Sequence, residues 1–186
     1  MEIEGKSHNA ALNRAVAVTV VAVAVFVAIT KVKDDNIVTT MQLSKADAVD
    51  LWNEYQSGRI KLHIDDNQLR EMNVGPSAGR DSAAFVSETD RLRANVAKYT
   101  NQSAELMRKA QSKEKDYESL HGRHEQFGLS DAFFSIALAL AAVAALTELS
   151  LLLSVAWAFA AIGLATALAG FGILAIHLGA VASLLG

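Results

Sequence analysis

The apolar and polar positions of this chain fall into two contrasting patterns. Residues 129–186 are almost uniformly apolar, and Asp131 and Glu148 are their only charged side chains. Residues 15–30 form a second uncharged run, made of Ala and Val with Phe26 and a few other residues. A helix needs about 20 mostly apolar residues to cross a bilayer. These runs therefore predict membrane-spanning helices, because a soluble domain of this size cannot bury so much apolar surface.

The apolar runs predict three spans. We place the first at residues 12–32, with charged ends that reach the membrane surface. The rival interpretation of this run, a cleaved signal peptide, lacks a convincing cleavage site. We expect the second span at 129–146, where Ser130 and Asp131 are residue types that suit a helix N-terminus.

A third span follows the polar break at residues 147–150. We expect it from Leu151 to about Leu174, with Gly170 and Gly172 offering a place to bend. Residues 173–186 then either extend this span or lie at the membrane interface, and the sequence leaves both open.

Residues 33–128 carry apolar or small side chains at alternating steps of four and three, the spacing of a coiled-coil seam. The first half of this seam comprises Ile37, Met41, Ser44, Ala48, Leu51, Tyr55, Gly58, Leu62, Asp65, Leu69 and Met72. The second half comprises Phe85, Thr89, Leu92, Val96, Tyr99, Ser103, Leu106, Ala110, Lys113, Tyr117, Leu120, His124 and Phe127. Turn formers gather at about 73–80, and Asp81 or Ser82 can cap the helix that follows.

The predicted fold is an all-α membrane protein with three transmembrane helices and a long antiparallel coiled-coil hairpin between the first and second. Its expected parts are an N-terminal tail with the first span (1–32), an extramembrane helical hairpin (33–128) and a transmembrane hairpin with an apolar tail (129–186). Small residues at four-residue spacing, such as Gly163 and Ala167, let helices approach closely in lipid. The spacing leaves open whether they pack within the chain or between chains.

Charge and composition exclude several classes. Residues 31–128 hold 15 Lys and Arg against 16 Asp and Glu, and this balance argues against nucleic-acid binding, which needs a basic surface. The chain has no cysteine, so it has neither disulfides nor thiolate metal sites.

Four stretches carry a resemblance to a known family: Leu12–Ala17 and Asn36–Met41 around the first span, Lys45–Gln56 with its Trp52/Tyr55/Gln56 cluster, and His124–Asp131. In these stretches the chain resembles the bacterial membrane-protein family known as domain of unknown function 4337. The resemblance implies a multi-pass protein of the bacterial cytoplasmic (inner) membrane, and it implies no activity. Basic residues near the span ends favour a cytoplasmic hairpin, whereas the basic turn that relatives often carry, replaced by Glu148 here, argues for the reverse side.

Candidate chemistry is sparse. His121 and His124 beside Glu125 have the spacing of a metal pair, but no third ligand is evident. His63 with Asp65 and Asp66, and His177 in the tail, are better explained as solvated or interfacial groups. We therefore expect no catalytic, cofactor or metal site, and the spans carry no ionisable group near their middles of the kind typical of transporters.

The interaction candidates lie on the apolar surface. Trp52 and Tyr55 either pack inside the hairpin or, with Val38, Val49, Ile60 and Ile64, form a face wider than one partner helix covers. Together with Gly163 and Ala167, they favour a non-enzymatic structural or accessory membrane protein. Its partners would be membrane lipids and copies of itself or other membrane subunits. The alternative is an oligomeric channel lined by Thr19, Ser135 or Thr166.

Overall fold

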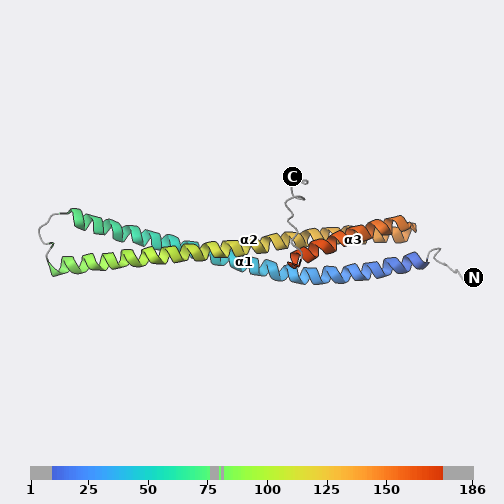
Figure 1. Cartoon of the computed structure of the whole chain (residues 1–186), viewed down its shortest axis with the longest axis horizontal. Coiled ribbons are helices and arrows are strands. Elements are labelled where there is room, and N and C mark those ends of the chain that lie inside the picture. Colours follow the sequence, from blue (N-terminus) through green and yellow to red (C-terminus); the bar gives the residue numbers. More distant parts are fainter. Residues whose placement is uncertain (1–9, 76–79, 81, 174–186) are drawn as a thin grey trace, which may run out of the picture. The chain divides into compact units, whose positions relative to one another are not determined.

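The protein is all-helical. The computed structural model describes residues 10–75, 80 and 82–173, and within them it contains α1 (Ala10–Val74), α2 (Ala83–Thr147) and α3 (Ser150–Gly170) (Figure 1). The described residues include no strand. The predicted all-α class is therefore confirmed.

Each helix contains a stretch that is long and apolar enough to cross a membrane. The apolar windows of the three helices have mean hydropathies of 2.5, 2.1 and 2.1, and only 17%, 28% and 28% of their residues are buried within the chain. Apolar surface that the chain itself leaves open is what lipid covers in a membrane protein. Three helices of this length and composition are compatible with a multi-pass membrane protein.

The two long helices each join segments that the sequence divides. α1 continues without interruption from the expected span through residue 33 and onward to Val74. α2 continues through residues 128–131, so the expectation that Ser130 and Asp131 begin a helix is wrong. A change from polar to apolar composition does not itself break a helix, because both compositions satisfy the backbone hydrogen bonds equally well.

The packing divides the chain into two units. Unit 1 comprises residues 1–40 and 119–186, and unit 2 comprises residues 41–118. Unit 1 thus holds the apolar parts of all three helices, whereas unit 2 holds the polar parts of α1 and α2.

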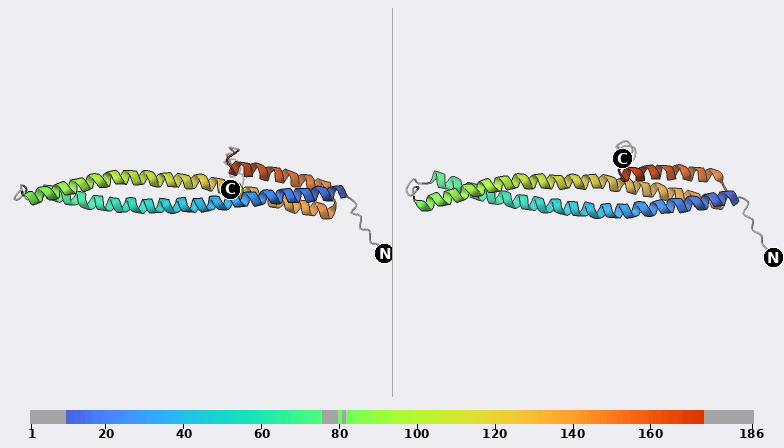
Figure 2. Two further views of the ribbon diagram at one scale, coloured as in Figure 1. Left: turned by 90° about the horizontal axis from the view of Figure 1, so that it is seen from below. Right: turned by 60° about the horizontal axis from the view of Figure 1, so that its bottom comes forward.

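The core of unit 1 consists of small and medium apolar side chains where the three helices meet. Its buried members are Leu12 and Val16 of α1, Ala141 and Ala144 of α2, and Leu153 and Ala156 of α3. In both views of Figure 2, α3 runs alongside the ends of α1 and α2. Alanine at the contacts lets the helix backbones approach closely, which is how helices associate in lipid.

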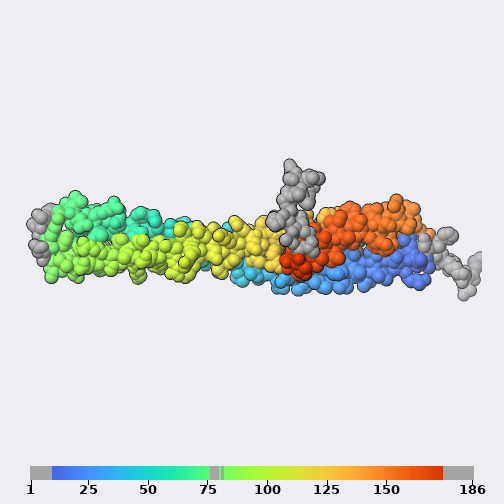
Figure 3. Space-filling view, in the orientation of Figure 1, coloured from blue at the N-terminus to red at the C-terminus, as the bar shows by residue number. Residues whose placement is uncertain are grey.

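Unit 2 is held together by the seam positions. Every seam residue named from the sequence is buried or half-buried. Lys113 Nζ reaches Asp47 Oδ2 at 2.8 Å, and Gln102 Nε2 reaches Glu54 Oε1 at 3.4 Å. As the residue numbers rise along α1, the numbers of their partners on α2 fall. The two segments therefore run antiparallel, and they lie side by side in Figure 3.

The helix ends have specific caps. The Ser82 hydroxyl accepts a hydrogen bond from the Phe85 N–H at 3.2 Å and so caps α2, as expected for an N-cap serine. Only Glu148 and Leu149 separate α2 from α3, and Glu148 adopts a left-handed conformation with φ 55°.

α3 ends at Gly170. The sequence places the end of this span later, at about Leu174. Gly172 has φ 79°, and its N–H bonds to Ala169 O while that of Ile173 bonds to Leu168 O. This is a Schellman motif, in which glycine supplies the left-handed residue. The tail from residue 174 onward, including His177, lies outside the described residues.

Candidate functional site

Trp52 and Tyr55 pack inside unit 2. The Trp52 Nε1–H donates to Glu114 Oε1 of α2 at 2.9 Å, and the two aromatic rings meet edge to face with centroids 5.4 Å apart. Buried tryptophan needs a partner for its N–H, and here that partner lies on the neighbouring helix. The hydrogen bond between Trp52 and Glu114 therefore ties α1 to α2, as the plainer of the two sequence interpretations expects.

Two contacts of lysine side chains lie in the same part of unit 2. The Asp47 carboxylate accepts a hydrogen bond from the Lys113 ammonium, and this contact raises the pKa of Lys113 above its ordinary value of 10.5. The Lys45 ammonium lies 5.1 Å from the centre of the Tyr117 ring, within the range of a cation–π contact. Both contacts join α1 to α2.

Ile60 and Ile64 of α1 behave differently. Their exposed fractions are 61% and 59%. Of the other three apolar residues that the sequence groups with them, Val49 is exposed, whereas Val38 and Trp52 are half-buried. Ile60 and Ile64 lie one helical turn apart, so they form an adjacent pair on the surface. We call this pair the isoleucine patch.

The seam beside the isoleucine patch has one position without large side chains. Gly58 faces Ser103 of α2, since a Cβ added to Gly58 would lie 3.6 Å from Ser103 Oγ. The Ser103 hydroxyl is buried without a hydrogen-bond partner. The next seam position of α1 is Leu62, which is half-buried, followed by the acidic Asp65. The two large apolar side chains of the isoleucine patch are thus exposed next to a seam position that holds only a glycine and a serine.

The histidines of α2 form two separate pairs. His124 Nδ1 lies 2.7 Å from Asp34 Oδ1 on α1, and His121 Nε2 lies 3.4 Å from Glu125 Oε1. Among the described residues, no three His, Cys, Asp or Glu side chains are placed to share a metal ion. His63 is exposed, and its neighbour Asp66 pairs with Arg70 at 2.9 Å.

Asp34 is the site residue that the sequence does not single out. It is 8% exposed, and its carboxylate is satisfied by His124 from a position 90 residues away. A signal was present, because Thr30 and Asp34 continue the 4-3 spacing upstream of Ile37. Both residues are buried, so the seam of α1 extends into unit 1.

Gly163 and Ala167 pack within the chain. Both are buried, and a Cβ on Gly163 would lie only 2.9 Å from Cδ1 of Phe134 on α2. The Gly163 carbonyl accepts hydrogen bonds from the Ser130 hydroxyl at 2.8 Å and the Thr166 hydroxyl at 2.9 Å. The small-residue spacing therefore joins α3 to α2.

A second polar link joins α3 to α1. The Trp157 Nε1–H donates to Thr19 Oγ1 at 2.9 Å, and the Thr19 hydroxyl donates to the Ala15 carbonyl at 2.8 Å. Each donor thus has an acceptor within the chain. Such mutual pairing removes the cost of placing an indole N–H and a hydroxyl in hydrocarbon.

The C-terminal end of α3 is held by Arg123 of α2. The Arg123 Nε–H donates to the Gly170 carbonyl at 2.9 Å, where a cation also interacts favourably with the negative end of the helix dipole. Phe127 packs against the same glycine and meets Phe171 edge to face at 5.1 Å. Arg123 therefore has a partner inside the protein.

These contacts show that the three helices of unit 1 are joined by hydrogen bonds as well as by apolar packing. Neither a curated protein nor a solved structure matches the chain. One family model matches, that of the domain of unknown function DUF4337, over residues 12–173. The match includes all of unit 2 and the described helices of unit 1 from Leu12 onward, and on this basis the chain belongs to the DUF4337 family.

Proposed function

We propose that this chain is a non-enzymatic structural or accessory protein of the bacterial inner membrane. In this proposal the apolar segments of α1, α2 and α3 cross the bilayer. Unit 2 forms an antiparallel coiled-coil hairpin outside it. The protein then assembles through its spans and through unit 2, either with copies of itself or as a subunit of a larger membrane complex.

The observation that carries the proposal is the exposure of two large apolar side chains at the isoleucine patch, next to a seam position that holds only a glycine and a serine. Ile60 and Ile64 are exposed, whereas the seam beside them contains Gly58 and the unpaired hydroxyl of Ser103. Full burial of such an apolar side chain stabilises by about 1.5–3 kcal/mol. A partner that covers the isoleucine patch would gain the free energy of burying these two side chains, which the hairpin itself leaves exposed.

The coiled-coil character of unit 2 is supported by its buried stripe. The 4-3 spacing holds on both helices, and the residues that follow it are buried or half-buried. A pattern of 3.5 residues per repeat keeps two helices in contact only if they wind gently around each other. Unit 2 thus offers an extended surface for recognition.

The spans leave apolar surface for further contacts. On α1, Val18, Val21 and Val25 are between 53% and 69% exposed. Such side chains are covered either by lipid or by the helices of another subunit. Basic residues near the span ends favour the cytoplasm for unit 2.

The alternative, an oligomeric channel, has less support. Two of its three pore candidates, Thr19 and Thr166, donate their hydroxyl hydrogens to backbone carbonyls of their own helices. Thr166 is also buried. Ser135 is exposed, and a single hydroxyl does not make a polar pore lining.

The proposal is tested by measuring mass and co-purifying proteins for the full chain in a mild detergent. We expect an oligomer or a defined complex. The double substitution Ile60→Ser and Ile64→Ser should shift it toward the monomer, by about tenfold in dissociation constant, because it removes roughly 1.4 kcal/mol or more of burial.

The matched control is Val86→Ser, which removes another exposed apolar side chain of unit 2 (49% exposed). It should leave the mass unchanged. A monodisperse monomer without any co-purifying protein would refute assembly. An oligomer that is insensitive to the double substitution would exclude the isoleucine patch as its contact.

A further inference from the structure

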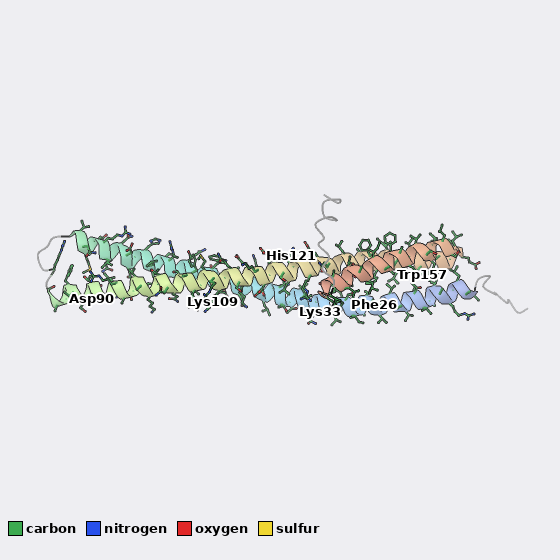
Figure 4. All side chains as sticks on the ribbon, in the orientation of Figure 1. Phe26, Lys33, Asp90, Lys109, His121 and Trp157 are labelled. Carbon is green, nitrogen blue, oxygen red and sulfur yellow. The ribbon has the colours of Figure 1, made fainter. Side chains whose placement is uncertain are left out.

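We propose that unit 1 contains a binding site for one anionic phospholipid, in a groove between α1 and α3. The groove has a volume of about 590 Å³. Arg14 lines one end of it, and Phe26 and Trp157, both labelled in Figure 4, line its walls. The phosphate of the lipid would meet Arg14, and one acyl chain would lie along the groove.

The walls of the groove are hydrocarbon. Val18 and Ala22 contribute from α1, Ala161 and Leu164 contribute from α3, and Phe134 of α2 contributes as well. The polar atoms of Thr19 and Trp157, which also line the groove, are bonded to each other. Because these donors are satisfied, the wall offers an acyl chain a surface without an unpaired polar side-chain group.

Arg14 gives the groove a charged end. Its side chain is exposed, and no described carboxylate forms an ion pair with it. It follows Leu12 and Ala10 at the beginning of the first span, where the membrane surface is expected. A guanidinium binds phosphate through two parallel hydrogen bonds, so an anionic headgroup complements this end of the groove.

The dimensions of the groove fit one chain of one leaflet. From Arg14 to Phe26, α1 rises about 18 Å at roughly 1.5 Å per residue. One leaflet of the hydrocarbon core is about 15 Å thick, half of roughly 30 Å. The groove therefore extends from the headgroup level to near the middle of the bilayer.

A phospholipid combines the two features that the groove requires of its occupant. Its phosphate is an anion that the Arg14 guanidinium can bind, and its acyl chain is apolar like the walls of the groove. The apolar middle of another span would match the walls alone.

The test is native mass spectrometry of the full chain in mild detergent, with phosphatidylglycerol or phosphatidylcholine added. We expect one phosphatidylglycerol to be retained in preference to phosphatidylcholine. Arg14→Gln should lower its retention about fivefold, the effect of one basic residue at an anionic surface. Ala161→Leu should lower retention by filling the groove.

Two further variants make the outcome decisive. Lys33→Gln removes a charge from α1 outside the groove and should leave retention unchanged, while Arg14→Lys should keep most of it. Equal retention of the two lipids, or no effect of Arg14→Gln in a protein of unchanged helix content, would overturn the proposal. It would also be overturned if Ala161→Leu changed the oligomeric mass while lipid retention stayed the same, since a second chain would then occupy the groove.

Discussion

Single residues of unit 1 show how closely its helices are fitted. At Gly163 the backbone of α3 approaches α2 closely, against the buried ring of Phe134. The sequence indicates a small-residue spacing here but not its partner, because both alanine-rich spans contain many such spacings. The partner became evident only from the contact with Phe134 and the hydrogen bond from Ser130.

Replacing Gly163 by valine should destabilise unit 1. The added Cβ would meet Phe134 at 2.9 Å, and overpacking of this kind costs about 1–3 kcal/mol. Thermal unfolding in detergent, followed by circular dichroism, should show the loss, and Phe134→Leu in the same chain should restore part of it.

Gly128 provides the control for this substitution. It lies in α2 with nothing within 4 Å of an added Cβ, so Gly128→Ala should stabilise by up to about 1 kcal/mol through helix propensity alone. Equal effects of the two substitutions would contradict the tight contact at Gly163.

At the scale of elements, the seam positions could be predicted because burial repeats with the 4-3 period on both helices. The continuity of α1 and α2 could not, because the change in composition near residues 32 and 128 resembles a boundary. The pairing of Asp34 with His124 was missed for the same reason. Asp34 continues the seam of α1, but it lies next to the expected end of the first span.

In α2 the spacing shifts once where α3 joins. Beyond Phe127 the buried positions are Ser130, Phe134, Ala137, Ala141 and Ala144. The 4-3 alternation therefore continues, but two successive steps of three, from His124 to Phe127 and on to Ser130, change its phase. The sequence of α2 alone does not indicate this shift, because the stretch that follows is apolar on nearly every side.

The cross-helix pair of Lys113 and Asp47 should make the stability of unit 2 depend on pH in the alkaline range. The carboxylate raises the pKa of Lys113, so folding favours the protonated amine. This contribution is fully present below the ordinary value of 10.5 and is lost as pH rises through the raised pKa of the folded state.

The measurement is thermal unfolding of the full chain between about pH 9 and 12, the range around the ordinary lysine pKa. Lys113→Arg, which stays charged, should reduce the loss of stability on going to high pH. Asp47→Asn should remove the part that depends on this pair. If the chain and Asp47→Asn lose stability in parallel, the pair contributes nothing.

At the scale of the whole molecule, composition and structure divide the chain in the same sense. Unit 1 contains the apolar segment of every helix, and unit 2 contains the charged seam flanks and the isoleucine patch. In the proposed topology α2 crosses the bilayer once between unit 2 and the turn at Glu148, so that these two segments lie on opposite sides. The proposed assembly through unit 2 and the proposed lipid binding in unit 1 both depend on this topology.

The most direct test of three crossings uses single cysteines, since the chain has none of its own. Cysteine replaces Glu148, Asp90, Val25 or Ile136 in turn, and each variant is exposed to a membrane-impermeant thiol reagent in sealed vesicles. We predict that the cysteines at 148 and 90 react from opposite sides, and that those at 25 and 136 react only after the membrane is dissolved. Labelling of positions 148 and 90 from the same side, or ready labelling of 25 and 136 in intact vesicles, would contradict a chain that crosses the bilayer three times.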